Sequence, residues 1–172
     1  MKEFLDPEEI LKGLNLPNNI IAADFGCGSG GWTIPLAKIL EKGKVFAIDI
    51  LKEPLSALEG KIKFEKIKNI SLITADVEKS VPLPEEGCDF VLMVNLLFQC
   101  ENKRRVLEEG KRVLKTKGKL LIVDWIKDNP LTKEIEWLDF EKVKKILKEL
   151  NFNLEKEFQI GSYHLALVLT KK

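Results

Sequence analysis

The strongest constraint in this sequence is the regular alternation of short apolar runs with longer amphipathic segments. Short apolar runs bounded by turn residues are typical of strands buried on both faces of a parallel sheet. Such strands are predicted at residues 20–25, 45–49, 70–75, 89–94 and 120–123. Helices are predicted before or between them, at residues 7–13, 32–40, 54–68 and 102–114. This order predicts an α/β fold with a doubly wound parallel sheet.

Two stretches depart from this alternation. Residues 81–87 contain two prolines and a glycine, which predict a loop between the third and fourth strands. After a turn predicted at residues 128–130, Asp139 is expected to N-cap a helix that runs to about residue 150. Strands predicted at residues 152–160 and 163–169 are separated by only two residues. They must be antiparallel, because a parallel connection needs a dozen residues or more.

The length of 172 residues is that of one domain. We therefore expect a single domain over residues 1–172, with an N-terminal helix in 1–14 and a ligand-binding half in 15–125. Residues 126–172 are expected to form a C-terminal helix and a β-hairpin.

Composition excludes several classes of protein. Twenty-eight Lys and Arg against 27 Asp and Glu leave a net charge of +1, which lacks the basic footprint of a dedicated nucleic-acid binder. A local basic patch is still compatible with an RNA substrate. Three cysteines without CxxC spacing argue against a disulfide framework or a zinc site and favour a cytoplasmic location, and no metal site is predicted. No apolar run approaches the roughly 20 residues of a membrane span, and the start of the sequence lacks a secretory segment.

A glycine-rich loop follows the first predicted strand. Gly26, Gly28 and Gly31 match GxGxxG, a pattern typical of dinucleotide binding, whereas Gly26, Gly28 and Gly30 match GxGxG, which indicates S-adenosylmethionine. Either loop would bring backbone N–H groups and a helix N-terminus close to a ligand. A tight strand-to-helix turn without a ligand is the remaining interpretation.

Carboxylates end three successive predicted strands, where open parallel sheets bind their ligands. Asp24 could hold an ammonium group, directly or through water, and would disfavour a pyrophosphate. Asp49, 21 residues after Gly28, is placed to accept hydrogen bonds from ribose hydroxyls. Asp76 could accept from an adenine amine while the Val77 N–H donates to the ring, although a loop-capping role fits Asp76 almost as well. Ile50 could pack on the adenine or belong to the core.

These motifs resemble those of the class I S-adenosylmethionine-dependent methyltransferases over about residues 15–172. The resemblance rests on the order of Asp24–Gly30, Asp49, Ala75–Val77 and Leu114–Leu120. Within the last of these, Thr116 and Lys117 stand where the family has Pro and Gly. The most similar branch is that of the small ubiquinone- and menaquinone-biosynthesis-type and related small-molecule methyltransferases. The resemblance implies a Rossmann-like, seven-stranded sheet of order 3-2-1-4-5-7-6 with strand 7 antiparallel.

The resemblance also implies a methyl donor, S-adenosyl-L-methionine, and the product S-adenosyl-L-homocysteine. Residues 15–125 then form the donor-binding half, and the implied donor-binding residues are Asp24, Gly26, Cys27, Gly28, Gly30, Asp49, Ile50, Asp76, Val77 and Asn95. Asn95 is followed by Leu-Leu-Phe and not by the Pro-Pro-Tyr or Pro-Pro-Trp of enzymes that methylate base amines. This difference argues against methylation of base amines, and the expected acceptor is a small or apolar molecule, with nucleic acid disfavoured but not excluded.

No catalytic residue follows from the motifs. Asp124 and His164 are candidates for a general base, as are Glu101 and Asp128, and a structural role is the first expectation for His164. His164 is the single histidine, which excludes mechanisms that need two imidazoles. Two other functions remain open: a subunit that binds S-adenosylmethionine and needs a partner for its acceptor site, and a nicotinamide-dependent oxidoreductase. Asp24 and the terminal hairpin disfavour the oxidoreductase. The sequence predicts no oligomeric state.

Overall fold

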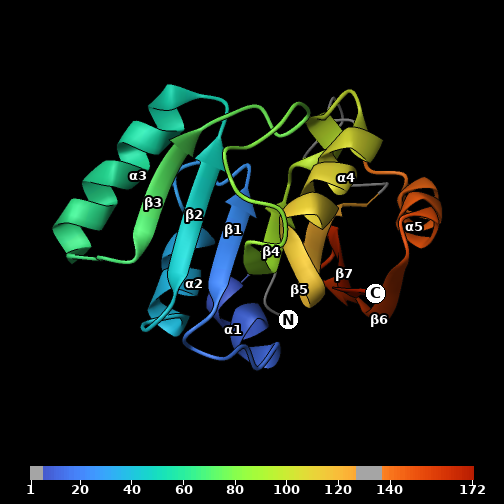
Figure 1. The fold of residues 1–172 in the computed structure, drawn as a ribbon, viewed down its shortest axis with the longest axis horizontal. Helices are drawn as coiled ribbons and strands as arrows, with labels where there is room; N and C mark the ends of the chain where they lie inside the picture. The colour runs from blue at the N-terminus through green and yellow to red at the C-terminus, as the bar shows by residue number, and fades with distance from the viewer. Residues whose placement is uncertain (1–5, 127–136) are drawn as a thin grey trace.

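A computed structural model describes residues 6–126 and 137–172 (Figure 1). The described residues form a seven-stranded sheet of order β3-β2-β1-β4-β5-β7-β6. Its strands are β1 Ile21–Phe25, β2 Lys44–Asp49, β3 Ile70–Thr74, β4 Cys88–Val94, β5 Leu114–Trp125, β6 Phe152–Ile160 and β7 His164–Lys171. β7 pairs antiparallel with β5 and β6, and the other pairs are parallel. The expected α/β fold and strand order are confirmed.

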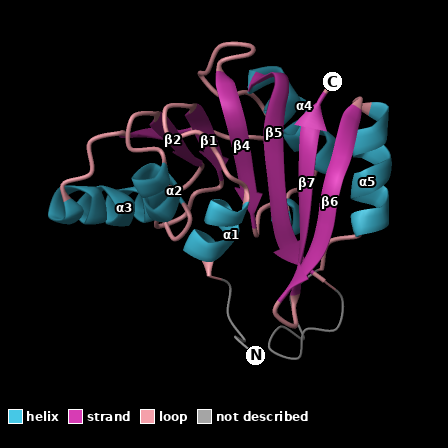
Figure 2. Ribbon diagram, turned by 90° about the horizontal axis from the view of Figure 1, so that it is seen from below, coloured by secondary structure: helices cyan, strands magenta, loops and turns pink. Residues whose placement is uncertain are grey.

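Helices cover both faces of the sheet. They are α1 Pro7–Gly13, α2 Thr33–Ile39, α3 Lys52–Glu65, α4 Lys103–Val113 and α5 Phe140–Glu149, with a short 3-10 helix, η1, at Leu97–Gln99. Ala22 and Ala23 in β1 point to opposite faces of the sheet. Ala22 belongs to an apolar cluster with residues of α1 and α2, and Ala23 belongs to a cluster with residues of α4 and α5. α3 and α5 lie toward opposite edges of the sheet (Figure 2). None of the helices described is long and apolar enough to cross a membrane.

The boundaries of two elements differ from the prediction. β5 was expected at residues 120–123 but begins at Leu114, directly after α4. Its first residue pairs with Cys88, and the register then shifts before Phe90, which marks a bulge that apolar patterning alone does not reveal. α3 ends at Glu65, earlier than expected, because Lys66 adopts a left-handed conformation that terminates the helix.

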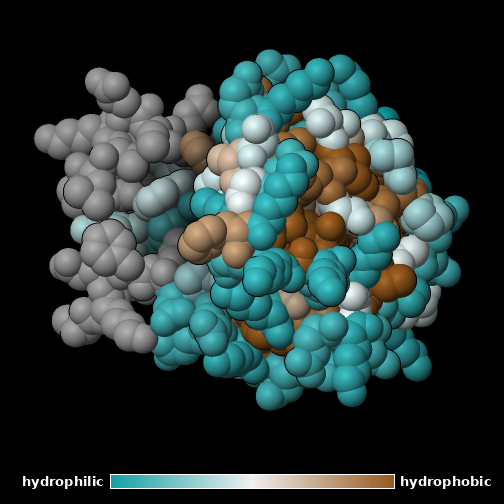
Figure 3. Space-filling view, turned by 90° about the vertical axis from the view of Figure 1, so that its left-hand side faces the viewer, coloured by the Kyte–Doolittle hydropathy of each residue, from teal (hydrophilic) through white to brown (hydrophobic). Residues whose placement is uncertain are grey.

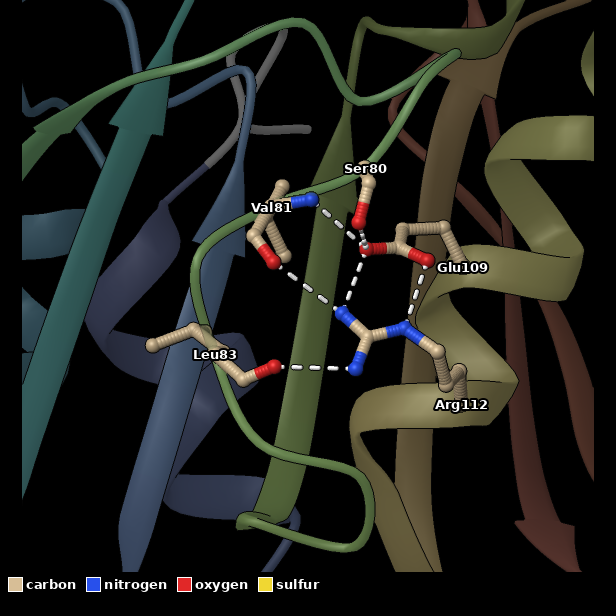
Figure 4. Close-up of polar contacts among 5 residues, drawn as sticks. All are labelled: Ser80, Val81, Leu83, Glu109 and Arg112. Atoms are coloured by element: carbon tan, nitrogen blue, oxygen red, sulfur yellow. Dashed lines mark hydrogen bonds and ion pairs between the residues drawn. The ribbon is translucent and has the colours of Figure 1, made fainter.

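The connection between β3 and β4 contains no helix in residues 75–87, all of which the structure describes. An ion pair on α4 anchors this connection (Figure 4). Glu109 accepts from the Val81 N–H at 2.7 Å, and Arg112 pairs with Glu109 at 2.6 Å. Arg112 also donates to the carbonyl oxygens of Leu83 and Val81 at 2.9 and 3.1 Å. These bonds fix residues 81–83 of the connection to α4.

β3 forms one edge of the sheet, and α3 packs against its Ile70 and Leu72 side chains. β3 is only half-buried along Ile70–Ile73. The view from this edge shows apolar surface among hydrophilic groups (Figure 3). Single exposed apolar residues are common on proteins, but a continuous apolar area is a candidate contact surface.

Candidate functional site

A cavity of about 940 Å³ opens at the carboxyl edge of the parallel strands. Its size lies within the range of about 300–1,000 Å³ that is usual for small-molecule sites. It lies where the strand order reverses between β1 and β4, which is where open α/β sheets bind ligands. Seven of the ten donor-binding residues that the resemblance implies line it together: Gly26, Gly28, Asp49, Ile50, Asp76, Val77 and Asn95.

The glycines of the loop after β1 have different reasons to be glycine. Gly26, Gly28 and Gly30 all have positive φ, at 71°, 52° and 88°. A Cβ on Gly26 would lie 2.8 Å from a methyl of Leu96, and one on Gly30 would lie 2.3 Å from a methyl of Leu58. A Cβ on Gly28 would meet nothing within 4 Å, and Gly28 lines the cavity. The first and third glycines thus permit close packing, whereas the second leaves space for a ligand.

Asp49 joins this loop to the end of β2. Its carboxylate accepts hydrogen bonds from the Gly28 and Leu51 N–H groups, both at 2.9 Å. Each carboxylate oxygen keeps capacity for a further hydrogen bond, so Asp49 can still bind two hydroxyl groups. Ile50 and Leu51 beside it are 59% and 56% exposed and offer an apolar surface at the cavity.

Asp24 lies behind the loop and not on the cavity wall as described. Its side chain is 2% exposed and accepts a hydrogen bond of 2.6 Å from the Thr33 hydroxyl. Burial, aided by the charge of Asp49, raises the pKa of Asp24 to about 7. Cys27 is also buried, and burial raises the pKa of its thiol, which keeps the sulfur protonated. Among the described residues, Asp24, Cys27 and Gly30 support the cavity lining from behind.

The contacts of Asp76 are compatible with both roles that the sequence leaves open, loop capping and adenine binding. Its carboxylate accepts from the Glu78 N–H at 3.0 Å and lies 3.2 Å from the Lys79 ammonium, which is a loop-capping arrangement. It also lines the cavity. The charged residues in the described lining are four acids and two bases: Asp49, Asp76, Glu78, Glu101, Lys79 and Arg105. This balance suits a cationic ligand better than a pyrophosphate.

Asn95 lines the cavity and contacts His164, although the two residues are 69 positions apart in the sequence. The Asn95 Oδ1 atom lies 3.1 Å from His164 Nε2, and Asn95 has a positive φ of 49°. His164 is 6% exposed, and its ring packs against the Trp125 ring in a tilted arrangement, with 3.9 Å between ring centroids and 40° between ring planes. Burial lowers the pKa of His164 to about 4, so the imidazole is neutral at pH 7. The sequence contains no local signal for this pair, because it depends on β7 lying beside β5.

The candidates for a general base are placed differently. Asp124 is fully buried and accepts from the N–H groups of Trp125 and Phe98 at 2.9 and 3.2 Å. It thereby anchors η1, and burial raises its pKa to about 6. Of the described residues, Glu101 lines the cavity, and Asp124 and His164 do not. Asp128 and the turn predicted at 128–130 lie outside the described residues, as do 1–5.

Comparison with known proteins identifies the family. The model of the family described as "Methyltransferase domain" matches residues 23–122. A demethylmenaquinone methyltransferase of Geobacillus sp. (strain WCH70) is 30% identical over 118 residues, which are 68% of this chain and 50% of that protein. The enzyme of the same name from Staphylococcus aureus (strain MRSA252) is 27% identical over 154 residues, 88% of this chain and 63% of that protein. The chain thus spans about half the length of the first of these curated relatives.

Solved structures show the same relationship. A crystal structure of a SAM-dependent methyltransferase from Aquifex aeolicus superposes with a TM-score of 0.87 and 28% identity, over 99% of this chain and 92% of that one. The magnesium protoporphyrin IX methyltransferase of Synechocystis PCC 6803, solved with bound SAM, shares the fold at a TM-score of 0.76 and 17% identity, over 96% of this chain and 76% of that one. The family match, the strand order and the glycine-loop cavity agree, and the chain belongs to the class I S-adenosylmethionine-dependent methyltransferase domains.

Proposed function

We propose that this methyltransferase domain binds S-adenosyl-L-methionine in the 940 Å³ cavity and transfers its methyl group to a small, apolar acceptor. The observation that carries the donor site is that Gly28, Asp49 and Asp76 line one cavity, with open space where a Cβ of Gly28 would be. These residues come from three different connections at the edge of the sheet. Their convergence supports a bound ligand better than a tight turn alone.

Each lining residue has a role that its contacts leave available. Asp49 accepts hydrogen bonds from the ribose hydroxyls, and Ile50 packs on a face of the adenine. Asp76 accepts from the adenine amine while the Val77 N–H donates to a ring nitrogen. The buried carboxylate of Asp24 acts on the ammonium group through water, because the described cavity wall separates the two. The excess of acids stabilises the positive charge of the donor.

Methyl transfer from this donor requires mainly that the reacting groups be aligned. When bound, the donor supplies an electrophilic methyl group: the acceptor's electron pair forms a bond to this carbon as the carbon–sulfur bond breaks, leaving S-adenosyl-L-homocysteine. The chain must hold the reacting groups in line and exclude water. Asp124 and His164 stay candidates for a general base, although their described contacts are with backbone N–H groups and Asn95. An acceptor that loses its proton easily would need neither.

A small apolar acceptor is supported by the relatives and by the cavity. The curated relatives are named demethylmenaquinone methyltransferases, whose acceptor is a quinone-type compound. In this chain, Ile50 and Leu51 give the cavity an apolar margin. We therefore propose a hydroxylated aromatic compound of the quinol type as the acceptor class.

A second function rests on a separate observation. The edge strand β3 is only half-buried although α3 packs against it, and apolar surface is visible on that side (Figure 3). This surface favours a subunit that binds the donor and completes its acceptor site with a partner. Methyl transfer by the purified chain alone would exclude this alternative.

The decisive experiment is a calorimetric titration with S-adenosyl-L-homocysteine, followed by transfer of a radiolabelled methyl group to a panel of quinols, phenols, lipids and tRNA. Asp49→Ala is expected to weaken donor binding at least tenfold, because it removes the ribose contacts and the anchor of Gly28. Asp89→Ala is the matched control, since Asp89 is the second residue of β4, at the opposite edge of the sheet, and bonds Ile21 and Lys115. Equal affinities for both variants would refute the donor site.

A further inference from the structure

The contact between Asn95 and His164 lies between the cavity and the part of the sheet that β5 and β7 form. The carboxylates that we assign to the donor follow β2 and β3, on one side of the point where the strand order reverses. Asn95 follows β4 on the other side, and its N–H donates to the Val123 carbonyl of β5 at 2.8 Å. An acceptor must reach the methyl group from a direction that the donor does not fill. Asn95 therefore lies between the proposed donor and the direction from which an acceptor can still reach the methyl group.

The hydrogen bonds of Asn95 leave one group unused. Gln99 Nε2 donates to the backbone carbonyl of Asn95 at 2.9 Å, and the backbone N–H is bonded to β5. The side-chain Oδ1 meets His164 Nε2. Because a carbonyl oxygen only accepts, the proton of the neutral imidazole lies on Nε2. Among residues 6–126 and 137–172, the Asn95 Nδ2 group has no hydrogen-bond partner.

His164 is well placed to hold this arrangement. Its backbone pairs with Trp125 on β5 and with Ile160 on β6, and its ring packs against the Trp125 ring. A buried imidazole that is fixed on two sides can orient the amide more firmly than a solvated side chain could. The amide of Asn95 is thus held with its oxygen toward β7, and its two N–H donors have no partner in the part of the chain that the structure describes.

We propose that His164 is a positioning residue: it turns the Asn95 amide so that Nδ2 donates a hydrogen bond to the hydroxyl or phenolate oxygen of an aromatic acceptor. This inference rests on the proposed methyltransferase function and adds how the acceptor is recognised. An oxygen acceptor fits because Nδ2 offers two donors and no lone pair, which would not suit a protonated amine.

The first test uses the fact that His164 is the single histidine of the chain. Long-range nitrogen–proton NMR spectra of the ligand-free protein report its tautomer and its titration without assignment ambiguity. We expect the Nε2–H tautomer and no protonation above about pH 5. The Nδ1–H tautomer would mean that the amide has the reverse orientation and would overturn the proposal, as would an ordinary titration near pH 6.5.

The second test separates positioning from donor binding. The protein saturated with S-adenosyl-L-homocysteine is titrated with 1-naphthol, an aromatic hydroxyl compound, and the side-chain amide signals of Asn95 are followed. We expect naphthol to shift these signals and His164→Leu to weaken naphthol binding about five- to tenfold, as the loss of one oriented hydrogen bond predicts. His164→Gln, which keeps an N–H donor, should restore most of the affinity.

The outcomes distinguish this inference from the proposed function. S-adenosyl-L-homocysteine should bind to both His164 variants within threefold of the unaltered protein, and a larger loss would place Asn95 on the donor instead. Failure of naphthol to bind, or binding that leaves the Asn95 amide signals unmoved, would overturn the assignment of the acceptor oxygen. Failure of S-adenosyl-L-homocysteine to bind to the unaltered protein would refute the proposed function, while the His164 tautomer would still be measured.

Discussion

Alanine substitutions at two neighbouring glycines should separate ligand binding from stability. Gly28→Ala and Gly30→Ala add the same methyl group two residues apart in the same loop. Both positions have positive φ, which costs an L-residue about 1–2 kcal/mol. At Gly28 this is the whole cost, since no atom lies within 4 Å of the added carbon. At Gly30 the added carbon would lie 2.3 Å from the fully buried Leu58, and overpacking adds about 1–3 kcal/mol.

The two variants should therefore differ in which property they lose: Gly30→Ala loses more stability, and Gly28→Ala loses affinity for the donor product. We expect Gly30→Ala to lose about 2–5 kcal/mol of unfolding free energy, against about 1–2 kcal/mol for Gly28→Ala. In urea titrations with a slope of about 2 kcal/mol per M, the midpoint of Gly30→Ala falls by about 1–2.5 M. Calorimetry should show that Gly28→Ala loses at least tenfold in affinity for S-adenosyl-L-homocysteine, because its methyl group enters the cavity.

Either of two results would refute this reasoning. If Gly28→Ala binds S-adenosyl-L-homocysteine as the unaltered protein does, the donor does not approach the loop backbone at Gly28. If both variants unfold at the same urea concentration, Leu58 yields to the added methyl group and the third glycine is not required for packing. Binding of S-adenosyl-L-homocysteine by Gly30→Ala is compared at low temperature and without urea, where the variant is folded.

Two further predictions concern buried charges. Folding raises the pKa of Asp24 from 3.8 to about 7, so the stability that neutral Asp24 contributes is present below pH 4 and lost as the pH rises to 7. Asp24→Asn should remove this loss and stabilise the ligand-free protein at pH 8 by up to about 4 kcal/mol, measured by urea unfolding; a pH profile unchanged from that of the unaltered protein would contradict it. Arg112→Met should lower the unfolding free energy by about 2–3 kcal/mol, because Glu109 is 7% exposed and loses its partner. Arg105→Met removes an exposed ion pair of 3.5 Å and should lower it by less than about 1 kcal/mol. Equal losses in thermal unfolding would show that the anchor of the β3–β4 connection contributes nothing.

Much of the fold could be predicted because apolar runs and turn residues act locally. The order of all seven strands came from the family resemblance, and the antiparallel hairpin followed from the short link predicted between the last two strands, which has three residues in the structure. The early start of β5 could not be predicted, since it depends on a pairing between Leu114 and Cys88 across the sheet. The expectations of one domain over residues 1–172 and of a cytoplasmic location stay predictions.

The donor side of the site was more predictable than the acceptor side. Gly28, Asp49 and Asp76 each follow a strand, and the carboxyl ends of parallel strands meet at one edge. The contacts of Asp24 with Thr33 and of Asn95 with His164 join residues whose spacing carries no periodic signal. Such contacts follow from the packed structure, and the sequence therefore predicted for His164 only a structural role or that of a candidate general base, without its contact to Asn95.

The position of β7 has a consequence for how the molecule assembles. β7 follows β6 in the chain but lies between β5 and β6 in the sheet, so β5 stays an open edge until β7 has emerged from the ribosome. The donor half, with its sequentially connected strands, can form earlier in synthesis than the pairing of His164 with Asn95. A nascent chain at that stage would expose a long unpaired strand, which is the kind of surface that recruits chaperones or aggregates. Competence to hold an acceptor is therefore expected to be the last property that this chain acquires.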